Sequence, residues 1–191
     1  LHLCHHNLES IDTTSTTSDT LLAEVCMAAK YEGQSIKTHH PQHQETNPDT
    51  NSQICTVLAR SFADIGDIIR GRDIFRGNDE EKTKRDELDD KLKVIFAKIY
   101  EELSRTSTNG KKEELKARYN GDKNNDFFQL REDWWTANRH TVWEAITCDN
   151  RLGGNAYFHA TCNGEERTKG YCRCKDDQVP TYFDYVPQYL R

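Results

Sequence analysis

Cysteine is the most reactive residue type in this sequence, and its abundance allows disulfide chemistry. The 191-residue chain contains seven cysteines, an odd number. They are Cys4, Cys26, Cys55, Cys148, Cys162, Cys172 and Cys174. This density favours an oxidising compartment, and the odd number leaves at least one thiol without a partner in the chain. Cys172 and Cys174 are too close in sequence for an unstrained bridge to each other, and the other pairings stay open.

Two groups of histidines raise the question of a metal site. The first group, His2, His5 and His6, surrounds Cys4, and the second consists of His39, His40 and His43. Structural zinc usually takes two pairs of ligands, with about two to four residues between the members of a pair. The Cys172-x-Cys174 pair has a different spacing, and no second pair follows it. We therefore expect solvated loop histidines, no metal site and no cofactor.

Common catalytic motifs are missing from the sequence. It contains no Gly-x-Ser-x-Gly, no His-Glu-x-x-His and no glycine-rich phosphate loop. Isolated histidine, serine and aspartate residues occur in any chain of this size. The sequence therefore predicts a protein without catalytic residues, and not an enzyme.

Two clusters of basic residues could bind a polyanion such as a sulfated glycan. The first consists of Lys111, Lys112, Lys116 and Arg118, and the second is centred on Arg70, Arg72 and Arg76. On a helix, Lys112 and Lys116 lie one turn apart and project together. Clustered cations attract polyanions through charge and counterion release. The alternative interpretation of both clusters is ordinary surface charge.

The overall composition is that of a hydrophilic domain with a modest core. Hydrophobic residues make up 35% of the chain, and 26 basic against 32 acidic residues give a net charge of −6. Such a chain suits one domain stabilised in part by covalent links, and we expect no nucleic-acid partner. No run of 18 apolar residues is present, so the sequence predicts no membrane span within this chain.

The hydrophobic periodicity predicts a mainly α-helical fold. Helices are expected over residues 19–32, 54–69, 80–104, 111–119 and 127–148. Gly33 and Gly71 lie where the first two helices should end, and residues 37–53 should form a polar loop. Residues 149–181 are rich in glycine and cysteine and show no strand-like alternation of useful length. The elements that would carry the basic clusters are therefore helices and helix ends.

Aromatic residues gather in the last predicted helix. Trp134, Trp135 and Trp143 could stack on sugars, but such large side chains usually belong to the core, which is the interpretation we favour. Phe127 and Phe128 are expected to pack there as well. Arg139 should pair with a carboxylate inside the bundle, with Glu132 as one candidate.

Several segments in the same order resemble a known family. They are residues 64–73 (DIGDIIRGRD), 130–139 (LREDWWTANR), 142–148 (VWEAITC) and 179–191, supported by residues 1–4 and 19–36. Together they resemble the N-terminal alpha-type Duffy-binding-like domain of the malaria parasite erythrocyte membrane protein 1 family. The resemblance covers nearly the whole chain apart from residues 37–53 and 77–126.

The resemblance implies a disulfide-bonded, mainly helical domain with long loops. Residues 1–63 would form a loop-rich first subdomain, and residues 64–191 a helical-bundle second subdomain that is incomplete at its C-terminus. The implied function is adhesion at the extracellular face of the infected erythrocyte membrane, as part of a larger membrane-anchored, antigenically variant protein. The implied partners are heparan-sulfate-like glycans, blood-group sugars or complement receptor on host erythrocytes in rosettes, host antibodies, and neighbouring domains of the same protein. The alternative is a structural or domain-docking segment without a ligand site of its own, which should expose a large apolar patch.

Overall fold

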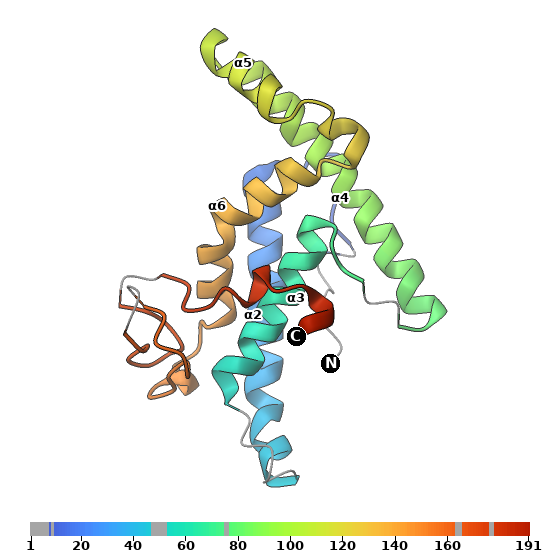
Figure 1. Cartoon of the computed structure of the whole chain (residues 1–191). Coiled ribbons are helices and arrows are strands. Elements are labelled where there is room, and N and C mark those ends of the chain that lie inside the picture. The colour runs from blue at the N-terminus through green and yellow to red at the C-terminus, as the bar shows by residue number, and fades with distance from the viewer. Residues whose placement is uncertain (1–7, 9, 47–52, 75–76, 163–165, 176–177) are drawn as a thin grey trace.

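Helices dominate the computed structural model of the chain (Figure 1). The structure describes all residues except 1–7, 9, 47–52, 75–76, 163–165 and 176–177. The α-helices are α2 (Ser18–Thr46), α3 (Ile54–Arg70), α4 (Asp79–Thr106), α5 (Asn109–Arg118) and α6 (Phe128–Ile146). Short 3-10 helices follow as η2 (Asp122–Asn125), η3 (Asn150–Leu152), η4 (Phe183–Tyr185) and η5 (Gln188–Leu190). Extended pairing in the described residues is limited to two isolated bridges, so the predicted mainly α class is confirmed.

The core lies where α2, α3 and α6 pack against one another. Trp135 and Trp143 of α6 are fully buried, and each places its ring centroid 5.1 Å from that of Phe62 on α3. Trp134 is buried as well, so the interpretation of the three tryptophans as core residues is confirmed. Phe127 joins this core, but Phe128 is 42% exposed, and its predicted packing is wrong. Phe128 is the first residue of α6, and its ring centroid lies 6.0 Å from the guanidinium carbon of Arg131.

Helix α2 is longer than predicted. It runs through Gly33 and Pro41 to Thr46, so the predicted helix end at Gly33 is wrong. The predicted loop over residues 37–53 is also wrong for residues 37–46, which are helical. A Cβ on Gly33 would lie 2.1 Å from the carbonyl oxygen of Ile146. Glycine is needed here for the close approach of α2 to the end of α6, and this packing outweighs its weak helix propensity.

The other helices follow the hydrophobic periodicity closely. Gly71 ends α3 in the left-handed conformation with φ 69°, as expected of a glycine after the last turn. Asn78 and Glu81 form a reciprocal capping box that starts α4. The predicted division after residue 63 falls within α3 and remains a prediction. In the described part of the chain, no helix is both long and apolar enough to cross a bilayer.

Candidate functional site

The first basic cluster lies on α5, which forms an arm with α4 that projects away from the core helices (Figure 1). Lys111 and Lys116 are exposed, and Lys112 is partly exposed. Arg118 is exposed but donates two hydrogen bonds of 2.5 Å to the carboxylate of Asp133. This hydrogen bonding raises the pKa of Arg118 and lowers the pKa of Asp133. Among the residues that the structure describes, the three lysines of the cluster have no ion-pair partner, whereas Arg118 is already paired.

The second basic cluster is divided between the core and the surface. Arg70 is only 1% exposed and contacts Asp67 at 2.9 Å and Glu132 at 3.2 Å. Burial therefore removes Arg70 from the surface candidates, because its charge serves interior pairing. Arg72 is exposed and pairs with Glu132 at 2.8 Å. Arg76 lies outside the described residues.

Arg139 pairs with a buried carboxylate, as predicted, but the partner is Asp184 and not Glu132. The guanidinium donates to both Asp184 oxygens, at 2.8 and 2.7 Å, and to the carbonyl oxygen of Thr181 at 2.7 Å. The Trp135 indole N–H also donates to Asp184, at 2.9 Å. Glu132 is instead shared by Arg70 and Arg72. These contacts attach the C-terminal segment to α6.

One disulfide joins the cysteine-rich segment to the bundle and a second lies within that segment, which confirms the prediction of a disulfide-bonded domain. Cys55 of α3 pairs with Cys172, and Cys162 pairs with Cys174. Cys26 is a partly buried free thiol, and burial raises its pKa to about 11, assisted by the negative charge of Glu144. Cys148 is an exposed free thiol, and Cys4 lies outside the described residues.

The histidine groups are only partly described. His2, His5 and His6 lie outside the described residues, as does Cys4. His39, His40 and His43 lie on α2 and not in a loop, which corrects the expectation for them. His39 places its Nδ1 atom 2.8 Å from the carbonyl oxygen of Ser35. Across the described stretches, no three histidine, cysteine or acidic residues are grouped to hold a metal ion.

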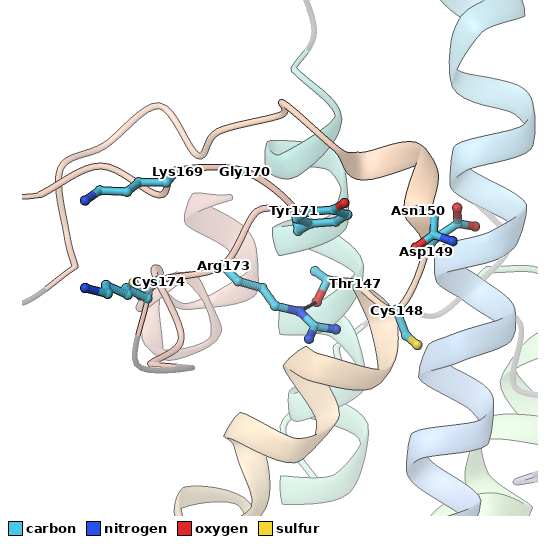
Figure 2. Close-up of a pocket in the computed structure, with 10 residues that line it drawn as sticks. Thr147, Cys148, Asp149, Asn150, Lys169, Gly170, Tyr171, Arg173 and Cys174 are labelled. Carbon is cyan, nitrogen blue, oxygen red and sulfur yellow. Dashed lines mark hydrogen bonds between the residues drawn. The ribbon is translucent and has the colours of Figure 1, made fainter.

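A cavity that sequence reasoning missed lies between the end of α6 and the disulfide-bonded segment (Figure 2). Its volume is about 470 Å³, and it is lined by residues 147–150, 169–171 and 173–175. In the view of Figure 2, the Tyr171 ring lies between Lys169 and Asp149, and Arg173 reaches the Thr147 hydroxyl. The walls come from the end of α6 and from a segment without helical or strand-like periodicity, so sequence patterns alone could not place them together. The one available signal was the group of basic residues among the late cysteines.

Comparison with known proteins places the whole chain in one family. The model of the Duffy binding domain matches residues 1–191. A search of curated proteins found no match. Duffy binding domains are adhesion domains and not enzymes, and this match confirms that the chain is not an enzyme.

Solved structures give a consistent picture. The NTS-DBL1-alpha and CIDR-gamma double domain of PfEMP1 from the Plasmodium falciparum varO strain is 39% identical, with a TM-score of 0.73 over 99% of this chain and 25% of that chain. The ICAM-1-binding PfEMP1 IT4var13 DBLbeta domain is 34% identical, with a TM-score of 0.68 over 100% of this chain and 39% of that chain. The DBLb domain of PF11_0521 PfEMP1, bound to human ICAM-1, is 27% identical, with a TM-score of 0.64 over 99% of this chain and 36% of that chain. This sequence thus spans about a quarter to two fifths of each solved chain. From the match over its full length, the chain belongs to the Duffy binding domain family.

Proposed function

We propose that this chain is an extracellular receptor-binding domain of an adhesin displayed on the infected erythrocyte. The observation that carries the proposal is its likeness over its full length to PfEMP1 domains, one of them named as ICAM-1-binding at 34% identity. The domain would be of the N-terminal alpha type and would act within a larger membrane-anchored protein. Antigenic variation and recognition by host antibodies belong to the same proposal.

The proposed ligands are host erythrocyte receptors that mediate rosetting. Heparan-sulfate-like glycans, blood-group sugars and complement receptor are the candidate classes. The α5 arm supports the first class, because Lys111, Lys112 and Lys116 have no carboxylate partner within the described ranges. An exposed helix with several cations suits a long polyanion that contacts them at once.

The test is binding of the oxidised chain to intact erythrocytes, with and without soluble heparin, across a salt series. Saturable binding that heparin and salt remove is the expected result, because glycan binding depends on counterion release. Binding that resists salt would redirect the proposal to a protein receptor or a neutral sugar. No binding by folded material would contradict receptor binding by this chain.

A second candidate function is docking of a neighbouring domain of the same protein. Tyr189, Leu190 and Ile74 are 75%, 66% and 58% exposed, and Tyr185 is exposed beside them. Ile74, Tyr185 and Tyr189 line a common hollow of about 170 Å³. Exposed apolar side chains gathered in this way favour a protein contact. This candidate predicts no erythrocyte binding and association with a neighbouring domain through these residues.

A further inference from the structure

An Asn-Gly pair, Asn120 and Gly121, forms the exposed part of the turn that follows α5. We propose that Asn120 is a site of spontaneous deamidation, at which the side-chain amide is hydrolysed to give aspartate or isoaspartate. The modification would add one negative charge to the α5 arm and would alter the joint between this arm and α6. This inference goes beyond the proposed adhesion function and does not depend on it.

The turn exposes the pair to solvent between two anchored residues. Asn120 and Gly121 are exposed, whereas Tyr119 and Asp122 are only 8% and 6% exposed. The backbone N–H of Asp122 donates to the carbonyl oxygen of Tyr119 at 3.1 Å and closes the turn. The Tyr119 hydroxyl donates to Asp133 at 2.9 Å. Water and solvent base therefore have access to the pair, while the residues on either side of it are held in place.

The local backbone favours the ring closure that deamidation requires. In the described part of the chain, the Gly121 backbone N–H and the Asn120 side chain have no hydrogen-bond partner. Gly121 has a left-handed φ of 75°, and a Cβ at this position would meet nothing within 4 Å. Glycine has no side chain that would shield its nitrogen, and its backbone rotates more freely than that of other residues. The Gly121 nitrogen can therefore approach the Asn120 side-chain carbonyl carbon without losing a hydrogen bond of its own.

The reaction balances with water as the only co-reactant, and nothing is oxidised or reduced. Solvent base takes the proton from the Gly121 N–H, and the nitrogen forms a bond to Cγ of Asn120. The bond between Cγ and the side-chain nitrogen breaks, and this nitrogen takes up a proton and leaves as ammonia. Water then opens the resulting succinimide ring. Cleavage at Cγ gives aspartate, cleavage at the main-chain carbonyl carbon gives isoaspartate, and either product carries one negative charge when ionised.

Two other Asn-Gly pairs in the chain allow a comparison, at residues 109–110 and 163–164. Asn163 lies outside the described residues. Asn109 is the first residue of α5. A helical ψ keeps the following backbone nitrogen away from the side-chain carbonyl carbon, so this end of α5 must open before Asn109 can react. Asn120 should therefore be modified faster than Asn109.

Modification of the turn would affect α6 through Asp122. The Asp122 carboxylate accepts hydrogen bonds from the backbone N–H groups of Gln129 at 2.9 Å and Leu130 at 3.0 Å, near the start of α6. Isoaspartate adds a methylene group to the backbone two residues before Asp122, which displaces this carboxylate from the two donors. The new charge also lies two residues from Arg118, which pairs with Asp133. The modified protein should therefore have a weaker joint between the α5 arm and α6.

The test is tryptic peptide mapping by mass spectrometry, after the oxidised chain has been incubated at body temperature and mildly alkaline pH. The three Asn-Gly pairs fall in separate tryptic peptides, residues 106–111, 119–123 and 152–167, so each is measured independently. Peptide 119–123 should gain about one mass unit at least about threefold faster than peptide 106–111, because Asn109 must first leave the helix.

Two matched variants connect the modification to the joint. Asn120→Gln keeps an amide but would need a six-membered ring, which forms more slowly, and it retains the other two pairs. After complete conversion at Asn120, the wild type should melt about 2–4 °C below Asn120→Gln incubated alongside, because hydrogen bonds that cap α6 are lost. Asn109→Gln makes the same change at the start of α5 and should leave the rate at Asn120 unaltered. Before incubation, all three proteins should melt alike.

Several outcomes would overturn the proposal. They are an unchanged mass for peptide 119–123, a gain in mass by peptide 106–111 that is as fast or faster, and equal melting of the incubated wild type and Asn120→Gln. None of these readouts uses a ligand, so each of these failures would leave the proposed function standing. Absence of erythrocyte binding by fresh, unmodified protein would contradict the proposed function alone.

Discussion

Arg139 and Asp184 form a buried two-contact ion pair that joins α6 to the C-terminal segment. Their contacts measure 2.8 and 2.7 Å, and the side chain of Asp184 is fully buried. The Trp135 indole donates to the same carboxylate, so one acidic group satisfies two buried donors from α6. Asp184 therefore holds the last segment of the chain against the tryptophan core.

We expect Asp184→Asn to destabilise the domain by about 3–5 kcal/mol, because it leaves the Arg139 charge buried without a counterion. Urea unfolding of the oxidised chain would measure this loss. The control is Asp90→Asn, because the Asp90 side chain is 77% exposed and pairs with Lys93 at 3.3 Å. That control should change the free energy of unfolding by less than about 0.5 kcal/mol. A loss below about 1 kcal/mol for Asp184→Asn would show that the pair is not a main attachment.

Gly33 and Gly110 allow a matched test of helix packing. A Cβ at Gly33 would lie 2.1 Å from the Ile146 carbonyl oxygen, whereas a Cβ at Gly110 would meet nothing within 4 Å. Gly33→Ala should therefore cost about 3 kcal/mol or more, since two helix backbones would have to separate. Gly110→Ala should be neutral or stabilise the chain by up to about 1 kcal/mol through helix propensity. Equal thermal shifts for the two variants would contradict the close approach of α2 and α6.

The two disulfides should differ in their contribution to stability. The Cys55–Cys172 bridge closes 117 residues, and the Cys162–Cys174 bridge closes 12. Loop-closure entropy predicts a loss of about 5 kcal/mol for Cys55→Ala with Cys172→Ala, against about 3 kcal/mol for Cys162→Ala with Cys174→Ala. Chemical denaturation of both double variants would measure the order. The reverse order would show that unfolded-state entropy is not the main contribution of these bridges.

The sequence was sufficient to predict the helices whose apolar residues repeat strongly, and the burial of the three tryptophans. Helices α3, α4, α5 and α6 each begin and end within about two residues of the predicted limits. It was not sufficient for the end of α2, because Gly33 is a local stop signal whose effect is overridden by contact with α6. Such a contact joins positions far apart in the chain, so the helix propensities of neighbouring residues cannot predict it.

The same limit applies to the site. Arg70 is one of several charged residues in sequence, and its burial follows from the convergence of Asp67 and Glu132 upon it. The partner of Arg139 lies 45 residues away, beyond any helical spacing. The cavity depends on disulfide pairing, which seven cysteines leave open. The exposed cations of α5 could be predicted directly, because the polar face of a helix follows from the order of residues within that helix.

Asp64 should make the stability depend on pH. Burial raises its pKa to about 6, although Arg191, 3.0 Å away, opposes the shift. The native state then holds this proton more tightly than the unfolded state does, so stability falls as pH rises from about 4 to about 6. Because Asp64 is 40% exposed, we expect screening to limit the effect to about 1 kcal/mol.

Asp64→Asn should remove this part of the pH dependence, so its stability advantage over the wild type should grow between about pH 4 and pH 6. Arg191→Gln removes the opposing charge and should move the titration to higher pH. Urea midpoints measured at half-unit intervals would test both variants. Parallel pH profiles for the wild type and Asp64→Asn would contradict the raised pKa.

The lysines of α5 should govern retention on immobilised heparin. Lys112→Glu with Lys116→Glu removes two cations from one helix face and should lower the salt concentration needed for elution, because fewer counterions are released on binding. The control is Lys30→Glu with Lys82→Glu, which makes the same change in net charge at exposed positions of α2 and α4. If the two double variants elute together, retention reflects net charge and not the α5 arm. If the α5 variant elutes like the wild type, long glycans contact another face of the domain.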